Sequence, residues 1–379
     1  MIPFNKPFLT GKETDYIKVA VATGKISGDG IFTRQCQVFF EQKYGFAKTL
    51  LTSSCTDALE MCALLLDIKP GDEVIMPSYT FVSAANAFVL RGAHIVFADS
   101  SADNPNIDPT QIETLITSRT RAICVVHYAG VACNMSAIMH LAQRHHLYVI
   151  EDAAHAIDAF FEQKPLGGIG HLATFSFHDT KNIVSGEGGM LVINDTKFID
   201  RAEIVREKGT NRSAFFRGEV NKYEWVDLGS SFLPSEITAA FLFAQLEHLQ
   251  QIQQKRTALW QYYHQCLQPL AAQGILQLPQ VPEYATLNGH IFYLVCQNLS
   301  QRSKLIDCLR KKEIYAVFHY LPLHLSRYYL AHNPTHHLKM ASIYADCLVR
   351  LPLFYELTFA QIDYIVYCIY EFFEQKNSL

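Results

Sequence analysis

A lysine and an aspartate stand at two points of this chain where a ligand could meet them. Lys181 follows a short aromatic segment, Phe175–Phe177, and precedes a glycine-rich run, Ser185–Gly189. Asp152 ends an apolar segment about thirty residues upstream. Pyridoxal phosphate (PLP) requires a lysine for its Schiff base and a carboxylate for its pyridinium nitrogen. The pair therefore indicates amino-group chemistry.

Lys181 also has a plain interpretation, because most lysines in loops are solvated surface residues. Three features favour a functional role. The preceding strand is apolar, Ser176 offers a hydroxyl to a phosphate, and the following glycines let the backbone approach a ligand closely. Burial and neighbouring cations would lower the pKa of the amine and make it a usable nucleophile and base. We therefore predict that Lys181 is the catalytic residue.

The acidic pair Glu151–Asp152 ends a predicted strand. Ligands of α/β sheets lie at the carboxyl ends of parallel strands, and a carboxylate there keeps a pyridine nitrogen protonated. Asp152 is the candidate for this role, with a turn cap as the alternative, and Glu151 points to the other side of the strand. His155 is expected to stack on the cofactor or to hydrogen-bond with it; the alternative is a structural histidine at a helix start.

A hydroxyl-rich segment, Ser53–Asp57, joins a predicted strand at Thr49–Thr52 to a predicted helix. A helix N-terminus with free amides binds anions, so this segment and Ser176 together predict a phosphate site. A simple N-cap is the alternative. Phe81 follows another strand, and its ring could stack on the pyridine, although core packing is the simpler explanation for an aromatic residue there.

Residues 50–195 alternate between strand and helix periodicities. Several strands are short and almost continuously apolar, as expected for strands buried on both faces. The alternation predicts an α/β fold with a mainly parallel sheet and right-handed crossovers. Helix starts are marked by Asp108 before Pro109 and by Asn134. The expected strands are 73–76, 95–98, 122–127, 147–151, 173–177 and 190–194, and the expected helices are 56–66, 83–90, 111–117 and 135–145.

The pattern changes in the last third of the chain. A long helix, with room for a bend, is predicted from about Ser235 to Leu267. After Pro279 and Pro282 the segments are typical of a smaller α+β domain, so we divide the chain into a large PLP-binding α/β domain with an N-terminal arm (1–250) and a small domain (251–379). The small domain is expected to hold strands 290–296 and 315–319 and helices 303–312, 338–349 and 359–375.

The composition excludes several classes of protein. Hydrophobic residues make up 49% of the 379 residues and charged residues 18%, which allows a large core and some apolar surface covered by a partner chain. The net charge is −4 and no basic stripe occurs, which excludes a nucleic-acid partner. Ten cysteines without a CxxC pair indicate thiols in a reducing compartment, the cytoplasm.

We expect no membrane span and no secretion, because no run of about eighteen apolar residues and no signal-peptide pattern occurs. A histidine-rich segment with His332, His336 and His337 indicates a polar loop, since no converging set of ligands accompanies it. No metal site is therefore predicted.

Longer segments of the chain resemble one family almost from end to end. They are residues 1–5 (Met-Ile-Pro-Phe-Asn), 66–81, 127–133 (His-Tyr-Ala-Gly-Val-Ala-Cys), 206–213, 229–231 and 317–324. In these segments the chain is similar to DegT-type, PLP-dependent sugar-nucleotide aminotransferases. The resemblance implies a fold type I, aspartate-aminotransferase-like α/β transferase with a large domain and a smaller C-terminal α+β domain. It also implies a homodimer with active sites at the subunit interface.

The resemblance assigns cofactor contacts by position. It makes Lys181 the Schiff-base lysine, Asp152 the partner of the pyridinium, and Phe81 a neighbour of the ring. His155 stands where relatives carry glutamine or histidine. Ser231 stands where many relatives carry an asparagine that reaches the phosphate of the partner subunit, a departure that leaves its role open. The residues implied to hold the phosphate are Cys55, Thr56 and Ser176.

Substrate contacts are implied in two further segments. Tyr320 and His324 match a family loop near the substrate. Lys208 and Arg212 lie where they could meet a nucleotide diphosphate, for which a guanidinium fork is well suited.

The reaction implied is transfer of an amino group from L-glutamate to the C4 ketone of dTDP-4-keto-6-deoxyglucose. The products would be dTDP-4-amino-4,6-dideoxygalactose and 2-oxoglutarate, for lipopolysaccharide or enterobacterial common antigen synthesis, with pyridoxamine phosphate formed during turnover. Alternative acceptors are a C3 ketone, a UDP sugar, or a C4 ketone aminated to a gluco product. A PLP-dependent sugar dehydratase is disfavoured, because such relatives replace the lysine with histidine.

Two other classes of protein fit less well. A PLP-binding regulator would require a DNA-binding module, for which no segment remains. A nicotinamide dehydrogenase would require a Gly-x-Gly-x-x-Gly turn, whereas the early strand-to-helix turn here is Ser-Ser-Cys-Thr.

Overall fold

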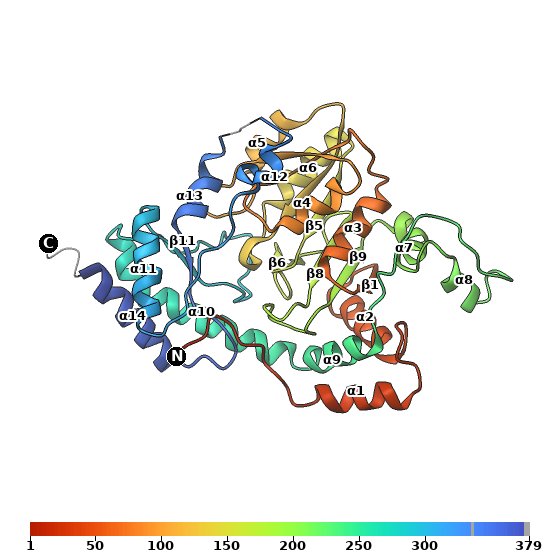
Figure 1. The fold of residues 1–379 in the computed structure, drawn as a ribbon, viewed down its shortest axis with the longest axis horizontal. Coiled ribbons are helices and arrows are strands. Elements are labelled where there is room, and N and C mark those ends of the chain that lie inside the picture. Colours follow the sequence, from red (N-terminus) through yellow and green to blue (C-terminus); the bar gives the residue numbers. More distant parts are fainter. Residues whose placement is uncertain (335–336, 375–379) are drawn as a thin grey trace.

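A seven-stranded sheet forms the centre of the protein (Figure 1). The computed structural model describes residues 1–334 and 337–374. The strand order is β1-β9-β8-β5-β4-β2-β3, and β9 alone runs against the other six, which confirms the predicted mainly parallel sheet. The strands are β1 (Lys48–Thr52), β2 (Glu73–Pro77), β3 (His94–Ala98), β4 (Thr120–Val126), β5 (Tyr148–Asp152), β8 (Leu172–Ser176) and β9 (Gly189–Ile193).

The apolar strands are buried on both faces, because side chains alternate between two separate cores. In β4, Ile123 and Val125 join one core, and Ala122 and Cys124 join the other. The helices on the first face are α1 (Glu13–Ala22), α2 (Ile31–Tyr44), α5 (Pro109–Leu115), α6 (Met135–His145) and α9 (Glu236–Leu246). Those on the second face are α3 (Cys55–Leu65), α4 (Val82–Val89) and α7 (Ile199–Arg206).

The predicted helix starts are confirmed by their side-chain caps. Asp108 accepts a hydrogen bond from the backbone N–H of Thr110 at 3.0 Å, and Pro109 opens the helix. Asn134 accepts one from Ala137 N–H at 3.1 Å. Each cap satisfies a backbone donor that the first turn of a helix leaves without a partner.

The long helix predicted from Ser235 is divided into two. α9 ends at Leu246 and α10 (Leu249–Ala272) follows after a short turn, in which His248 N–H donates to Gln245 C=O at 3.0 Å. The two helices have different packing partners, since α9 lies against α1 and α2 and α10 lies against α14 (Phe359–Glu374). The helix is divided because its two halves pack against different neighbours. Local periodicity contains no information about those neighbours.

The C-terminal segments form a core of their own with α10. A short antiparallel pair, β10 and β11, lies beside α11, α13 and α14, and Ile2 joins this core from the N-terminus. The division at residue 250 stays a prediction. The elements are β10 (Tyr293–Val295), α11 (Leu299–Lys311), α12 (Arg327–Leu330), α13 (Lys339–Cys347) and β11 (Leu348–Arg350).

The strand predicted at 315–319 is wrong. Val317 makes only an isolated bridge to Arg350, with N–H to C=O distances of 3.1 and 2.7 Å. The chain then turns at Tyr320, whose φ of 53° lies in the left-handed region and ends extended pairing. The predicted helix 338–349 also ends early, because its last residues form β11. Residue 375, predicted to end the last helix, and His336 lie outside the described residues.

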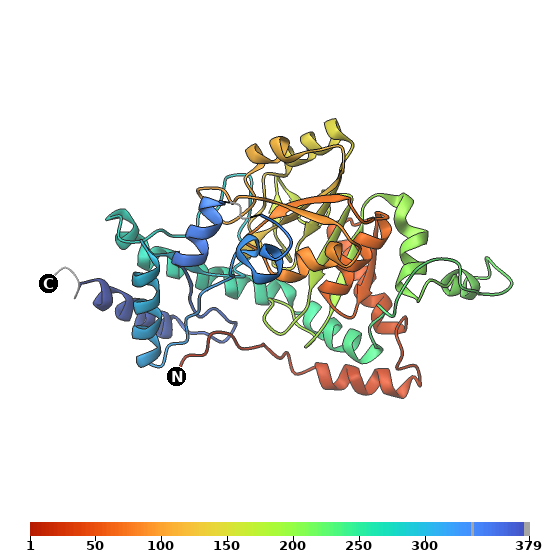
Figure 2. The same ribbon diagram turned by 45° about the horizontal axis from the view of Figure 1, so that its top comes forward.

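Residues 207–231, here called the projecting segment, stand out beyond α7 at one end of the molecule (Figure 1, Figure 2). They include the short helix α8 (Arg212–Phe216). The remaining elements are the hairpin β6 (Phe160–Phe161) and β7 (Lys164–Pro165) and the 3-10 turns η1 (Tyr128–Gly130), η2 (Thr196–Phe198) and η3 (Leu323–Leu325).

None of the described helices is both long and apolar enough to cross a bilayer. The cysteines all lie in the described part of the chain and are thiols, most of them buried.

Candidate active site

A cavity of about 570 Å³ opens at the carboxyl ends of the parallel strands. This is where α/β sheets bind ligands, because the strand-to-helix loops diverge there. Its walls come from the ends of β4, β5 and β8, from the N-termini of α3 and α4, and from C-terminal residues. The predicted residues that line it are Cys55, Thr56, Phe81, Asp152, His155, Ser176, Lys181 and Tyr320.

Lys181 reaches this cavity from the loop after β8. A turn fixes the loop, in which Lys181 N–H donates to His178 C=O at 2.9 Å and Asp179 N–H donates to Gly186 C=O at 3.1 Å. Burial lowers the pKa of the Lys181 amine to about 8, and the charge of Arg350 adds to the effect against the opposing influence of Cys55 and Asp152. A substantial neutral fraction near pH 8 makes this amine a nucleophile and a base.

Asp152 ends β5 beside the same cavity and is only 6% exposed. Burial raises its pKa, although the N–H of Ala154 at 3.1 Å and the charge of Lys181 act in the opposite direction. A buried carboxylate with a cation nearby can hold a further positive group, such as a protonated ring nitrogen.

The neighbouring Glu151 is buried on the opposite side of the sheet. It accepts hydrogen bonds from His127 Nε2 at 2.9 Å and from backbone N–H groups of Gly167, Ile169 and Gly170 at 2.8, 2.8 and 2.6 Å. Burial alone would raise its pKa, but these donors lower it. Glu151 therefore anchors a loop, whereas Asp152 faces the cavity.

The N-terminus of α3 supplies an anion site on another wall. Ser54 caps the helix by accepting from Asp57 N–H at 3.0 Å, which leaves the amides of the first turn directed outward. Thr56 Oγ1 lies 2.9 Å from Ser83 Oγ, and Ser176 ends β8 nearby in the cavity wall. A side chain at Gly189 would come within 2.3 Å of Ser54, so only glycine lets the chain pass this helix end.

His155 lies within a group of aromatic rings behind Lys181. It is 7% exposed, and its ring lies 4.5 Å from that of His290 and 6.2 Å from that of His319, between centres. Burial and the charge of Lys181 hold its pKa well below the ordinary value, so the ring is neutral.

The loop that carries Tyr320 enters the cavity through this residue. Its ring stacks on His319 at 3.6 Å and lies 6.3 Å from the Phe81 ring. Phe81 is 58% exposed at the N-terminus of α4. A left-handed backbone at a tyrosine is uncommon, and such strain is concentrated at functional sites.

Four predicted residues do not line the cavity. His324 is buried under the β2 end, where its Nδ1 lies 2.7 Å from Ser78 Oγ. Lys208, Arg212 and Ser231 belong to the projecting segment, and all three are exposed. Arg212 packs on the Phe216 ring at 5.1 Å, and Ser231 makes an isolated bridge to Glu207.

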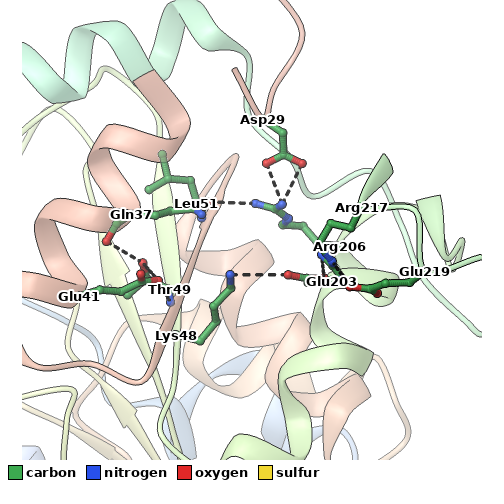
Figure 3. A network of polar contacts seen from close by, with 10 residues as sticks. All are labelled: Asp29, Gln37, Glu41, Lys48, Thr49, Leu51, Glu203, Arg206, Arg217 and Glu219. Atoms are coloured by element: carbon green, nitrogen blue, oxygen red, sulfur yellow. Dashed lines mark hydrogen bonds and ion pairs between the residues drawn. The ribbon is translucent and has the colours of Figure 1, made fainter. Parts of the chain in front are cut away.

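The base of the projecting segment is fixed by a polar network (Figure 3). Arg206 contacts both oxygens of Asp29 at 2.8 and 3.0 Å, and it also donates to Gln37 at 3.3 Å. Glu203 lies between Lys48 at 3.6 Å and Arg217 at 2.7 Å. The segment therefore starts from a fixed base although its tip is exposed.

The polar cavity residues that sequence reasoning missed include His290, His319 and Arg350. His319 lies in a segment that resembles the family but carries no motif of its own. Arg350 interrupts an apolar run, Leu348–Leu353, and a charge in such a run was the available signal. In the described part of the chain, no group of three or more acidic, histidine or cysteine side chains is arranged to hold a metal ion.

The chain matches the model of the DegT/DnrJ/EryC1/StrS aminotransferase family over residues 8–370. It is 32% identical to the spore coat polysaccharide biosynthesis protein SpsC of Bacillus subtilis strain 168, over 86% of this chain and 85% of that protein. Among solved structures it is similar to DesV of S. venezuelae, with 29% identity, 98% of each chain covered and a TM-score of 0.89.

A second similar structure is the Helicobacter pylori aminotransferase PseC, which is involved in the biosynthesis of pseudoaminic acid. The identity is 25%, 99% of each chain is covered, and the TM-score is 0.91. Together with the parallel sheet, these likenesses confirm the predicted fold class, a fold type I α/β transferase.

Proposed function

The chain belongs to the DegT/DnrJ/EryC1/StrS aminotransferase family, and from this membership we propose that it transfers an amino group to a keto sugar carried on a nucleotide, with PLP as cofactor. The observation that carries the proposal is the meeting of Lys181 and Asp152 in one cavity at the carboxyl ends of the parallel strands.

The residues present fit PLP. When bound, PLP supplies an electron sink that stabilises negative charge on the carbon attached to the transferred nitrogen. Lys181 offers the amine with a lowered pKa, and Asp152 offers the carboxylate for the pyridinium nitrogen. The N-terminus of α3, with Thr56 and Ser176, offers amides and hydroxyls for the phosphate.

Lys181 carries the proton transfers. Its Nζ takes the proton from the donor Cα in the first half-reaction and delivers a proton to the sugar carbon in the second. The rings of His155, His290 and His319 around it are neutral, the first two buried and the third half-buried, so they keep water away from this amine without competing for its proton.

For the substrates we propose L-glutamate as donor and dTDP-4-keto-6-deoxyglucose as acceptor, giving dTDP-4-amino-4,6-dideoxygalactose and 2-oxoglutarate. A role in cell-surface polysaccharide synthesis, of the lipopolysaccharide or enterobacterial common antigen kind, is supported by the likeness to SpsC, a polysaccharide biosynthesis protein. The thiol state of the cysteines suits a cytoplasmic reaction.

We also propose that two copies form a homodimer in which the projecting segment of one copy completes the cavity of the other. The segment exposes large apolar side chains, with Phe216, Tyr223 and Trp225 at 69, 53 and 78%. Several exposed large apolar side chains on one segment favour a protein–protein contact site there. Lys208, Arg212 and Ser231 would then approach the partner's site, where the cations suit a diphosphate.

The test is to mix the purified protein with PLP, L-glutamate and dTDP-4-keto-6-deoxyglucose and to identify the sugar nucleotide by mass and NMR. A 4-amino sugar with an axial amine is expected. An equatorial amine, or an amine at C3 from the isomerised ketone, would replace the proposed product while keeping the aminotransferase. Cofactor bound to Lys181 without any amino sugar would overturn the proposed reaction.

A further inference from the structure

Asn182 directly follows Lys181, is 5% exposed and lies outside the cavity wall. Its side-chain nitrogen donates two hydrogen bonds, to Gln253 Oε1 at 2.8 Å and to the backbone carbonyl of Asn288 at 2.9 Å. Its side-chain oxygen lies 2.8 Å from Nδ1 of His290, which does line the cavity. One buried amide beside the candidate Schiff-base lysine therefore contacts two segments that are distant in the sequence, α10 and residues 288–290.

These contacts fix the position of the proton on the His290 ring. The backbone carbonyl of Asn288 can only accept, so the group of the Asn182 amide that faces it must be the NH2. The oxygen of that amide then faces His290, and Nδ1 of the ring must carry the proton. Burial, together with the charges of Lys181 and Arg256, holds the pKa of this ring well below its ordinary value. His290 is therefore neutral, and its Nε2 carries no proton.

Asn288 joins this network to the loop that follows β5. Its Nδ2 donates to the carbonyl oxygens of His155 and Ile157 at 2.7 and 3.0 Å, and its Oδ1 accepts from the backbone N–H of His290 at 3.1 Å. Since β5 ends at Asp152, this loop directly follows the candidate partner of the pyridinium nitrogen. The loop after Asp152 and the loop that carries the lysine are thus fixed to one residue, Asn288.

The residues of the network are closely packed and fully hydrogen-bonded. A side chain at Gly130 would come within 2.0 Å of Asn288 Oδ1. Gln253 Nε2 donates to the carbonyl oxygens of Ile157 and Asn288 at 3.2 and 3.3 Å, so every side-chain nitrogen and oxygen of Asn182, Gln253 and Asn288 has a partner. A buried network that is fully satisfied is rigid, and removal of one member leaves others without partners.

The properties of the Lys181 amine depend on a fixed, buried position. Burial lowers its pKa to about 8, and a loop that moved outward would admit water and reverse that effect. The other groups that act on the pKa of the amine are Cys55, Asp152 and Arg350, none of which belongs to the network, and the histidine rings near it are neutral. Loss of the Asn182 contacts would therefore change the amine through its burial and not through a lost charge.

We propose that Asn182 is a positioning residue for Lys181. It fixes the lysine loop to α10 and to the loop after β5, and it holds the cavity residue His290 as a neutral ring with its proton on Nδ1. This role rests on the proposed function, because it takes Lys181 as the proton carrier. The simpler alternative is a network that only stabilises the packing of α10, a role that would leave the amine unchanged.

Two substitutions of His290 separate the roles of its ring nitrogens. Asparagine places an N–H donor near the position of Nδ1, so His290→Asn can keep the bond to Asn182, whereas His290→Gln places its amide near Nε2 and loses that bond. Asn182→Ala removes the same bond from the other side. Asn194→Ala is the matched control, because Asn194 also donates to two carbonyl oxygens, those of Gly167 and Gly170 at 2.9 and 2.8 Å, and lies outside the cavity wall.

For each variant we measure the rate of PLP uptake by the cofactor-free protein against pH, the kcat and KM of transamination, and the Tm. In Asn182→Ala the pH at which PLP uptake levels off should rise by about one unit, because water reaches the amine. Its kcat should fall roughly 10–10²-fold with KM changed less than about threefold, since a displacement of about 1 Å can cost 10²-fold in rate.

The other variants should divide into two groups. His290→Gln should resemble Asn182→Ala in its pH profile and kcat, whereas His290→Asn should stay within about fivefold of the wild-type kcat, because its donor to Asn182 is kept. Asn194→Ala should lower the Tm, since two carbonyl oxygens lose a donor, and should leave the pH profile and kcat as in wild type.

Two results would overturn this role. One is an Asn182→Ala variant with a lowered Tm but the wild-type pH profile and kcat, which would leave the network a structural role only. The other is a loss in His290→Asn equal to or larger than that in His290→Gln, and this comparison decides even where Asn182→Ala does not fold. A wild-type protein that takes up PLP but transfers no amino group would instead contradict the proposed function, and the pH profiles of PLP uptake would still test Asn182.

Discussion

The cavity and the projecting segment differ in what a single chain provides. The cavity takes residues from β5, β8, α3, α4 and the C-terminal segments and buries their reactive groups together. The projecting segment leaves Phe216 and Trp225 exposed and keeps its cations, Lys208 and Arg212, at the surface. One copy therefore brings the proposed cofactor contacts together by itself, whereas the proposal gives the cations of the projecting segment a role only toward a second copy.

The two regions also differ energetically. In the cavity, Lys181 and Asp152 have pKa values shifted against their charged forms by burial, so each costs stability. At the base of the projecting segment, Arg206 and Asp29 satisfy one another, and the charge of Arg206 helps to lower the Asp29 pKa against the effect of burial. The candidate reactive groups of the cavity therefore lower the stability of the fold, whereas the paired groups at the base of the projecting segment raise it.

The largest effect is expected from Lys181→Ala. Turnover should fall by ~10⁴-fold or more, because the nucleophile and the proton carrier are lost together. The fold should remain, since burial of the amine itself costs stability and its removal takes from Asp152 only the electrostatic support of one charge. Activity assays and thermal unfolding check this, with the exposed Lys18→Ala as control. Substantial transamination by Lys181→Ala would contradict the assignment.

Asp152→Asn should slow both half-reactions by roughly 10²–10³-fold, because the cofactor nitrogen loses its charged partner. Its folded pKa is raised, so ionisation above the ordinary carboxyl pKa costs the folded state stability, and the variant should raise the Tm of the cofactor-free protein. The matched variant Glu151→Gln should instead lower stability by about 3 kcal/mol, since buried N–H donors lose acceptors. If Asp152→Asn and Glu151→Gln changed activity and stability equally, the separate roles assigned to these two residues would be wrong.

Arg206→Ala should lower the free energy of unfolding by about 2–4 kcal/mol, because Asp29 loses a partner that contacts both its oxygens. Arg217→Ala removes ion pairs to Glu203 and Glu219, but the arginine side chain is 45% exposed, so the free energy of unfolding should fall by less than about 1 kcal/mol. Denaturant titration of both variants measures this. If both variants lost the same free energy of unfolding, the buried pair at the base of the segment would contribute no more to stability than the exposed one.

Uptake of PLP by the cofactor-free protein should depend on pH through Lys181. The neutral amine attacks, so below its pKa of about 8 the rate should rise about tenfold per pH unit and then level off. Stopped-flow absorbance between about pH 6.5 and 9.5 provides the profile, whereas an ordinary lysine would level off only near its pKa of about 10.4. A rate of PLP uptake that still rises steeply near the highest pH would mean that the pKa of the Lys181 amine is not lowered.

The smallest effect is expected at the tip of the projecting segment. Trp225→Ala should weaken the proposed dimer by roughly tenfold or more in Kd, as expected for a central aromatic contact, while the stability of each chain changes by about 0.5 kcal/mol. Analytical ultracentrifugation measures the first quantity. Tyr367→Ala, another exposed aromatic at 62%, is the control and should leave Kd unchanged. An unchanged Kd in Trp225→Ala would remove this residue from the interface.

Short-range pattern by itself determined the sheet and one side of the site. Strand periodicity places Asp152 and Ser176 at strand ends, and parallel strands bring such ends to one edge of a sheet. Lys181 and the N-terminus of α3 are expected at the same edge, because each comes directly after the end of a strand. The order of strands and loops along the chain is therefore enough to group these residues at one site.

Only the tertiary structure decided the other wall. His290, His319 and Arg350 come from segments more than 100 residues after Lys181, and nothing in their local pattern reports which surface they meet. The division between α9 and α10, the missing strand at 315–319 and the outward course of residues 207–231 depend likewise on what packs against them. Local periodicity specifies which face of an element is apolar, whereas contacts between distant segments specify what that face covers.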